Sequence, residues 1–229
     1  MEQSKGLDGG TLKLMAAALM LIDHVGAILL PETVILRCIG RLAFPIFAFF
    51  IAEGYAHTRS FGRYLLRMAI WAAVSEIPFN LEFGHFFVPG RQNVLWTFCL
   101  ALLTLRGLDR LRREPGAIGY AGAALALATG FAAGELLHVD YGGWGVLLVT
   151  LFYLTREVRN RWAIQLVGLA LFCWFCSAWR LEMLAMLSLI PLCLYNGERG
   201  FSNKALQYGF YAFYPVHILI LSVLARYAF

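Results

Sequence analysis

Six ionisable side chains lie inside long apolar runs of this sequence and are the first candidates for chemistry. They are Asp23, His24, Arg41, Glu53, Glu76 and His217. An ionisable group at membrane depth is costly unless it is paired or faces a cavity, so each is a functional-site candidate. A histidine in such a place suits the removal of a proton from an amine or a hydroxyl near neutral pH. Acidic and basic groups at similar depth predict one polar cavity between helices.

His24 needs a partner from another part of the chain, because its neighbours one helical turn away are apolar. Asp23 is adjacent in sequence, but successive residues diverge by about 100° around a helix and do not face each other. We therefore expect Glu76, or a hydroxyl or amide of another segment, to orient His24. We expect Asp23 to pair with Arg41. The alternative is a histidine whose hydrogen bond only holds two helices together.

A stripe of polar side chains marks the last apolar segment. Gln207, Tyr211, Tyr214 and His217 follow one another at spacings of four, three and three. Such spacing aligns them along one face of a helix, as expected for a helix that borders a polar cavity. The alternative is an interfacial aromatic belt, but a belt gathers at one depth and this stripe runs along the helix axis.

The composition predicts that membrane-spanning helices position these residues. Of the 229 residues, 60% are hydrophobic and 14% are charged, and the mean hydropathy is +0.68. Soluble domains contain about 45–50% apolar and about 25% charged residues, so a water-soluble α/β enzyme, a disulfide-stapled secreted domain and a disordered chain are excluded. The five cysteines all lie in apolar runs, which indicates packing residues. The net charge of +5 indicates basic cytoplasmic loops and no nucleic-acid partner.

We expect an all-α, polytopic integral membrane protein with about nine transmembrane helices around a polar central cavity, in one domain over residues 1–229. At about 20 residues per helix, the apolar runs predict spans at 11–31, 39–57, 63–80, 92–106, 117–136, 142–156, 162–179, 181–196 and 205–226. Of the 19 Lys and Arg residues, the side opposite the N-terminus then holds only Arg37, Arg41, Arg91, Arg180 and Arg226. Since cytoplasmic loops hold the excess of basic residues, the N-terminus is predicted in the cytoplasm and the C-terminus outside.

A second polar group is expected on the cytoplasmic side, around the turn between the second and third spans. Its members are Glu53, His57, Arg59, Arg63 and Arg67, with Asn196 and Arg199 of another loop on the same side. Two guanidinium groups four residues apart lie on one helix face and can bind a phosphate-bearing ligand. No Walker-type phosphate loop occurs in the sequence. The alternative is that these arginines only set the orientation of the chain in the membrane and contact lipid head groups.

Several dense motifs, in order along nearly the whole chain, resemble the TraX family, whose best-known member acetylates the N-terminus of conjugative pilin. The matching segments are LKLMAAALMLIDHVGAILLP (12–31), LRCIGRLAFPIFAFFIAEGYAHTR (36–59), YLLRMAIWAAVSEIPFNL (64–81), NVLWTF (93–98), DYGGWGVLL (140–148), YNGERG (195–200) and FYAFYPVHILIL (210–221). The resemblance implies a multi-pass protein of the bacterial cytoplasmic (inner) membrane.

TraX in turn is similar to the transmembrane acyltransferases that use acyl-CoA, and this implies roles for single residues. The superfamily has an essential histidine on its first helix, which His24 matches, and a Phe- and Gly-rich second helix, which residues 44–55 match. Its arginine motif corresponds to Arg63 to Arg67. The superfamily arginines are usually three residues apart and these are four apart, so either one is the counterpart.

The resemblance implies acetyl transfer from cytoplasmic acyl-CoA to an amine or hydroxyl acceptor, such as a peptide N-terminus or a sugar, within the lipid bilayer and without a metal. His24 is then the general base or a transient acyl carrier, with Asp23 and His217 beside it at the catalytic centre. Tyr214, Asn93 and His217 are expected to donate to the oxyanion or to orient the acceptor. The predicted lining of the acceptor cavity is Arg41, Glu76, Asn93, Asp140, Tyr211 and Tyr214.

Two other functions fit parts of the pattern. A secondary transporter also places His, Glu and Arg at mid-membrane, but no pair of Gly- or Pro-broken helices recurs in two similar halves. A membrane assembly subunit would explain the helices and leave the buried charges without a role.

Overall fold

The computed structural model describes residues 6–176, 179–201 and 203–228. Within these residues the secondary structure is helical and contains no strand, and the only extended pairings are isolated bridges between Leu7 and Tyr195 and between Gln92 and Val139. The predicted all-α class is confirmed. Each predicted span overlaps a helix of the structure. Arg180, which was used above to predict the orientation, has a side chain that lies outside the described part of the chain.

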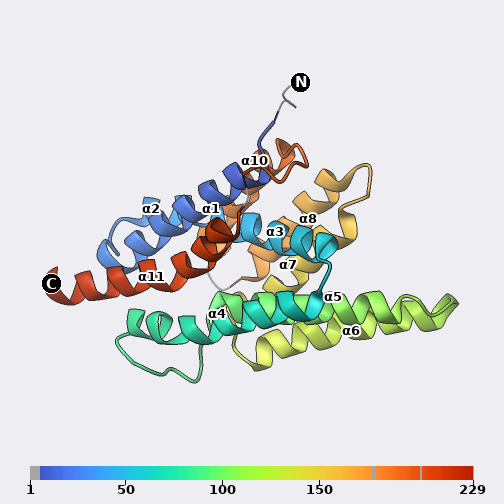
Figure 1. Ribbon diagram of the computed structural model, residues 1–229, viewed down its shortest axis with the longest axis horizontal. Coiled ribbons are helices and arrows are strands. Elements are labelled where there is room, and N and C mark those ends of the chain that lie inside the picture. Colours follow the sequence, from blue (N-terminus) through green and yellow to red (C-terminus); the bar gives the residue numbers. More distant parts are fainter. Residues whose placement is uncertain (1–5, 177–178, 202, 229) are drawn as a thin grey trace. The chain divides into compact units, whose positions relative to one another are not determined.

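Figure 1 shows the helices in order along the chain. They are α1 (Gly9–His24), the π-helix η1 (Val25–Leu29), α2 (Val34–Gly40), α3 (Ala43–His57), α4 (Phe61–Glu82), α5 (Val94–Leu111), α6 (Gly116–Leu136), α7 (Gly142–Thr155), α8 (Arg161–Phe175), α9 (Trp179–Glu182), the 3₁₀-helix η2 (Met183–Ser188), α10 (Leu189–Cys193) and α11 (Lys204–Ala228).

Fewer helices than the predicted nine are long and apolar enough to cross a membrane. Among the described residues, four helical segments meet both conditions: Gly9–Leu29, Val34–His57, Gly116–Leu136 and Ala205–Tyr227. Three others are apolar but shorter, namely Gly142–Thr155, Arg161–Phe175 and Met183–Cys193. In α5 the limit is charge, since its 18 residues include Arg106, Asp109 and Arg110. The apolar helices indicate a membrane protein, and the full set of nine spans stays a prediction.

The chain forms two compact units. Unit 1 consists of Met1–Phe47, Ile77–His85 and Leu169–Phe229, and unit 2 consists of Ala48–Glu76 and Phe86–Gly168. Three boundaries between the units fall within α3, α4 and α8, and the fourth falls in the connection between α4 and α5. The single domain expected over residues 1–229 stays a prediction.

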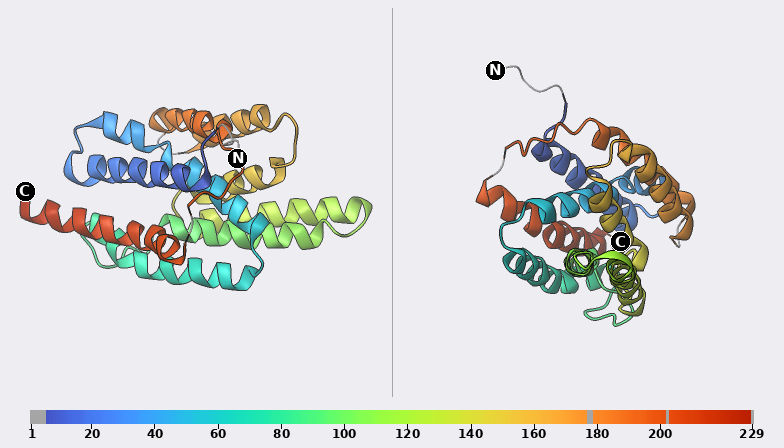
Figure 2. Two further views of the ribbon diagram at one scale, coloured as in Figure 1. Left: turned by 45° about the horizontal axis from the view of Figure 1, so that its top comes forward. Right: turned by 90° about the vertical axis from the view of Figure 1, so that its right-hand side faces the viewer.

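In unit 1, α1 packs against α2 and α11 (Figure 2). The helix α2 also contacts α9. The Asp8 carboxylate caps α1 by accepting a hydrogen bond from the Thr11 backbone N–H at 2.8 Å. Further along, α1 and α2 approach closely at Gly40, where an added Cβ would lie only 2.2 Å from the Cβ of Asp23. This close approach brings the polar end of α1 beside α2.

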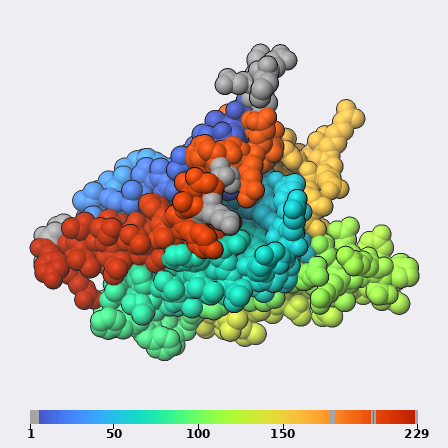
Figure 3. Space-filling view, viewed as in Figure 1, coloured from blue at the N-terminus to red at the C-terminus, as the bar shows by residue number. Residues whose placement is uncertain are grey.

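In unit 2, α5, α6 and α7 pack against one another. A glycine again allows close packing, since a Cβ on Gly130 of α6 would lie 2.1 Å from Thr104 Oγ1 of α5. The rings of Phe49 and Phe152 meet edge to face with centroids 5.7 Å apart and join α3 to α7. The end of α5 and the start of α6 lie together at the surface in green and yellow-green (Figure 3).

Candidate functional site

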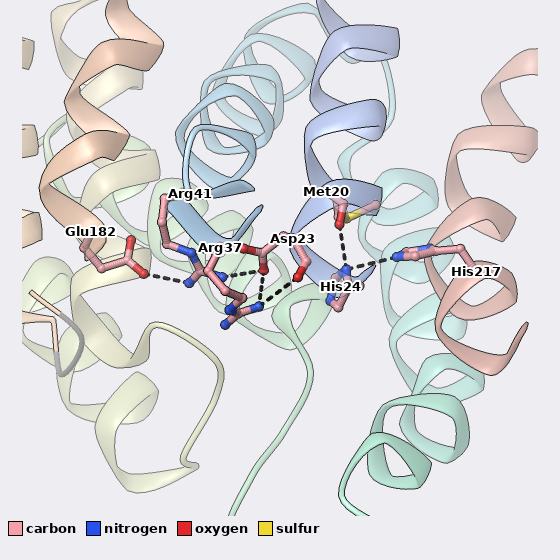
Figure 4. Close-up of polar contacts among 7 residues, drawn as sticks. All are labelled: Met20, Asp23, His24, Arg37, Arg41, Glu182 and His217. Carbon is pink, nitrogen blue, oxygen red and sulfur yellow. Dashed lines mark hydrogen bonds and ion pairs between the residues drawn. The ribbon is translucent and has the colours of Figure 1, made fainter. Parts of the chain in front are cut away.

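An ion-pair network joins the end of α1 to α2 in unit 1 (Figure 4). Arg37 Nη1 donates to Asp23 Oδ2 at 2.6 Å and to the Asp23 carbonyl oxygen at 3.2 Å. Arg41 Nε donates to Asp23 Oδ1 at 3.2 Å, and its Nη2 also bonds the Asp23 carboxylate. Arg37 and Arg41 are one helical turn apart, so both guanidinium groups reach the same acid. The predicted pairing of Asp23 with Arg41 is confirmed.

Glu182 extends this network to α9. Arg41 Nη1 donates to Glu182 Oε1 at 2.7 Å, and the Glu182 residue is only 2% exposed. The network therefore holds two carboxylates and two guanidinium groups, whose charges balance. Sequence reasoning missed Arg37 and Glu182. The signal for Arg37 was its spacing of four from Arg41, whereas Glu182 lay near the edge of a predicted span and gave no signal of its own.

A pair of histidines lies next to the network, at the end of α1 and on α11 (Figure 4). His24 Nδ1 lies 2.9 Å from the Met20 carbonyl oxygen and 3.0 Å from His217 Nε2. His217 is 5% exposed, and His24 is half-buried. The structure thus corrects the expected partner of His24 from Glu76 to His217, because α11 packs against both α1 and η1. Among the described residues Asp23 makes no bond to His24, as expected for adjacent helix positions.

The tyrosines of the polar stripe lie on α11 before His217. Tyr214 is 5% exposed, and its ring centroid lies 6.2 Å from that of His24 and 6.1 Å from that of His217. Tyr211, one turn earlier, is half-buried. The stripe therefore brings Tyr214 and His217 to the end of α1. In the described part of the chain, no three His, Cys, Asp or Glu side chains gather in a way that could hold a metal ion.

Glu76 and Asn93, predicted to line the acceptor cavity, meet each other in unit 2. Asn93 Nδ2 bonds Glu76 Oε1 and also donates to the Ala72 carbonyl oxygen at 2.8 Å, while the Asn93 backbone N–H donates to Glu76 Oε1 at 3.0 Å. Asn93 Oδ1 caps α5 by accepting from the Leu95 backbone N–H at 3.0 Å. Because both donors of the Asn93 amide are engaged, the expected donation from Asn93 to an oxyanion is not supported.

Asp140 lies in the turn before α7, close to the start of α5 in unit 2. Its backbone N–H donates to the Gln92 carbonyl oxygen at 2.9 Å, and its own carbonyl oxygen accepts from the Thr97 hydroxyl. The residue is exposed, and Tyr141 after it has a positive φ of 61°. Backbone groups of Asp140 therefore fix this turn, and its predicted place in an acceptor cavity stays a prediction.

The residues of unit 2 that were predicted to bind a phosphate-bearing ligand surround the turn between α3 and α4. Glu53 Oε2 and His57 Nε2 lie 3.5 Å apart, one turn from each other on α3. Arg59 and Arg63 are exposed, and the half-buried Arg67 places its guanidinium carbon 5.6 Å from the centroid of the Tyr64 ring. The turn therefore presents at least two exposed guanidinium groups.

The other predicted members of this phosphate-binding group, Asn196 and Arg199, belong to a loop of unit 1 that holds the start of α1. The Asn196 backbone N–H donates to the Leu7 carbonyl oxygen at 3.0 Å, and the Gly9 backbone N–H donates to the Glu198 carbonyl oxygen at 2.8 Å. Asn196 Oδ1 accepts from the Glu198 backbone N–H at 2.9 Å. Arg199 is exposed. A shared ligand for this loop and the α3–α4 turn stays a prediction.

Comparison with known proteins shows the family of this chain. The family described as TraX protein matches residues 8–225 of the chain. The chain belongs to the TraX family. The match covers the ion-pair network and both histidines, and it confirms the resemblance seen in the sequence motifs.

Two relatives are similar to this TraX chain. The "Probable fimbrial assembly protein FimC, serogroup H1" of Dichelobacter nodosus is 30% identical over 237 aligned residues, which cover 92% of each protein. The "Uncharacterized protein RP591" of Rickettsia prowazekii (strain Madrid E) is 35% identical over 75 residues, which cover 33% of this chain and 28% of that protein. No solved structure matches the chain.

Proposed function

We propose that this TraX protein is an integral membrane acetyltransferase of the bacterial inner membrane, with His24 as the group that handles the acceptor's proton. The observation that supports it is the histidine pair in unit 1, where His24 is held at Nδ1 beside a charge-balanced network. A general base has to be oriented by a further group and has to reach its substrate. His24 is oriented by His217 and remains half-buried.

The proposed reaction moves an acetyl group from acetyl-CoA to an amine or a hydroxyl. The lone pair of the acceptor attacks the thioester carbonyl carbon, and His24 takes the acceptor's proton. The carbon–sulfur bond then breaks, and the CoA sulfur leaves with the proton that His24 returns. In the alternative two-step route, a ring nitrogen of His24 attacks the thioester carbonyl carbon, and the carbon–sulfur bond breaks to release CoA as its thiolate. The acceptor then attacks the acetyl carbon on His24, the ring nitrogen leaves, and the acceptor's proton passes to the thiolate.

We place the nucleotide part of acetyl-CoA at the cytoplasmic arginines Arg59, Arg63 and Arg67, with the N-terminus of the chain in the cytoplasm and the C-terminus outside. Losing one charge-assisted hydrogen bond costs about 1.5–3 kcal/mol. Arg63→Ala and Arg67→Ala should therefore each raise the Kd for acetyl-CoA roughly ten- to hundredfold, measured by calorimetry in detergent. Arg226→Ala, at the exposed end of α11, is the matched control. An unchanged Kd in both variants would leave these residues with a topological role.

The central experiment incubates the purified protein with labelled acetyl-CoA and a panel of peptide amines, sugars and small amines. His24→Ala should lower transfer by about two to four orders of magnitude, the usual contribution of a general base, and should leave acetyl-CoA binding intact. His85→Ala is the control, because His85 is exposed in the connection after α4. Undiminished transfer by His24→Ala would contradict the proposal.

A role as a membrane assembly subunit is the second candidate, and the name of the Dichelobacter relative favours it. The two functions differ in what they require of the buried residues. An assembly subunit should tolerate His24→Ala in a pilus or fimbria assembly assay, provided that the protein still folds. An acetyltransferase should lose acetylation of its acceptor in the same cells.

A further inference from the structure

The hydrogen bonds around the two histidines determine which ring nitrogens carry hydrogen. A carbonyl oxygen can only accept a hydrogen bond. His24 Nδ1 lies 2.9 Å from the Met20 carbonyl oxygen, and His217 Nδ1 lies 2.5 Å from the Phe213 carbonyl oxygen. Both Nδ1 atoms must therefore be protonated.

A neutral imidazole has a single N–H, so its second nitrogen is an acceptor. His217 Nε2 is then an acceptor, and it lies 3.0 Å from the Nδ1–H of His24. The hydrogen on His24 Nδ1 is shared between His217 Nε2 and the Met20 carbonyl oxygen. His24 Nε2 is left with a lone pair, and within the described residues it has no hydrogen-bond partner.

The opposite polarity, with His217 donating to His24, is unfavourable for two reasons. It would require both nitrogens of His217 to carry hydrogen, and thus a positive charge on a residue that is 5% exposed. It would also turn the lone pair of His24 Nδ1 toward the Met20 carbonyl oxygen at 2.9 Å. The neutral arrangement avoids both costs.

We infer that His217 is a positioning residue that holds His24 in the Nδ1–H tautomer and so makes His24 Nε2 the base. This rests on the acetyltransferase function proposed above. When His24 Nε2 takes a proton from the acceptor, the ring becomes an imidazolium and its bond to His217 becomes charge-assisted and stronger. The sequence analysis expected His217 to donate to an oxyanion or to orient the acceptor. Since both nitrogens of His217 are engaged, His217 has no N–H left to donate to an oxyanion. A carboxylate fixes the tautomer of the base in other acyl-transfer sites, and here a neutral ring takes that place.

The test combines a tautomer measurement with kinetics on the full-length protein in detergent. Histidine labelled with ¹⁵N in the ring reports the tautomer through its couplings to the ring protons, and the signals that disappear in His24→Ala identify His24. The wild-type protein should show His24 with hydrogen on Nδ1. His217→Leu removes the acceptor, whereas His217→Gln places an amide oxygen near the position of Nε2.

In His217→Leu, the Met20 carbonyl oxygen is the one acceptor left among the described residues for the Nδ1–H of His24, so the fraction of His24 in the Nε2–H tautomer should rise above that of the wild type. The kcat should fall at least tenfold while the Kd for acetyl-CoA stays unchanged. His217→Gln should keep the Nδ1–H tautomer and recover most of kcat, which a purely structural role would not predict. An Nε2–H tautomer in the wild-type or Gln protein would overturn the inference, even if the Leu variant does not fold. So would an Nδ1–H tautomer with unchanged kcat in His217→Leu. If no acceptor is acetylated at all, the proposed function fails while the tautomer result stands.

Discussion

Unit 1 neutralises the buried acids Asp23 and Glu182 with guanidinium groups, whereas Asp109 of unit 2 accepts hydrogen bonds from uncharged tyrosine hydroxyls. In unit 1, Asp23 pairs with Arg37 and Arg41, and Arg41 also pairs with Glu182. In unit 2, Asp109 accepts from two tyrosine hydroxyls: Tyr55 Oη lies 2.8 Å from Asp109 Oδ2, and Tyr153 Oη lies 2.9 Å from the same oxygen.

The two arrangements suit different tasks. The tyrosine hydroxyls on Asp109 join α3, α5 and α7, which is the work of a structural clamp. The network of unit 1 also joins helices, but it stands next to a half-buried histidine whose Nε2 is free of hydrogen bonds within the described residues. The difference teaches that a buried charge is weak evidence for chemistry by itself, and that the open lone pair beside it is the more informative feature.

The largest effect is expected from breaking the ion pairs of unit 1. Asp23→Ala and Arg41→Ala should each lower the free energy of unfolding by about 3–5 kcal/mol, because each leaves the buried network with one uncompensated charge. The double variant should lose less than the sum, as for residues in direct contact. Denaturant unfolding in detergent gives the three values, and additive losses would argue against the pairing. Loss of acetyl transfer in Asp23→Asn with unchanged stability would instead make Asp23 catalytic.

A smaller effect is expected from the clamp of unit 2. Tyr55→Phe and Tyr153→Phe each remove a hydroxyl that donates to a carboxylate, and each should lower the free energy of unfolding by about 1.5–3 kcal/mol. The kcat of the folded protein should stay the same, because the clamp is structural. A kcat that falls while stability is preserved would move Asp109 into the chemistry and would erase the contrast between the units.

The smallest effect is expected at the start of α5. Asn93→Ala removes the cap of that helix and should cost about 0.5–2 kcal/mol of stability. Asn93→Ser keeps a capping oxygen but loses the amide donors to Glu76 and Ala72, so it separates the cap from the contact with α4. If Asn93→Ser restores the stability and kcat is equal in all three proteins, Asn93 is structural. A kcat that is lower in both Asn93 variants than in the wild-type protein would place Asn93 in the acceptor site.

Sequence reasoning was sufficient for the helices and for one contact of the site. Each predicted apolar run overlaps a helix, although α2 lies mostly in the predicted connection between the first two spans. Membrane depth together with a short connection predicted that Asp23 meets Arg41. The expected depth in the membrane did not show whether Glu76 or His217 is the partner of His24. Residues far apart in the chain meet only through the packing of helices, which the sequence does not report. Glu182 was missed for the same reason. Apolar composition also does not report where helices such as η2 and α10 are short, so the count of nine spans stays a prediction.

The absence of a side chain at Gly40 has a consequence for how this family varies. A single methyl group there would occupy the space of the Asp23 side chain, with a separation of 2.2 Å between the two Cβ atoms. A relative that gains a side chain at this position has to move its first two helices apart or give up the acid on the first one. The residues at positions 23 and 40 are therefore expected to change together during evolution, and a paired substitution in an alignment of relatives would reveal a differently built site.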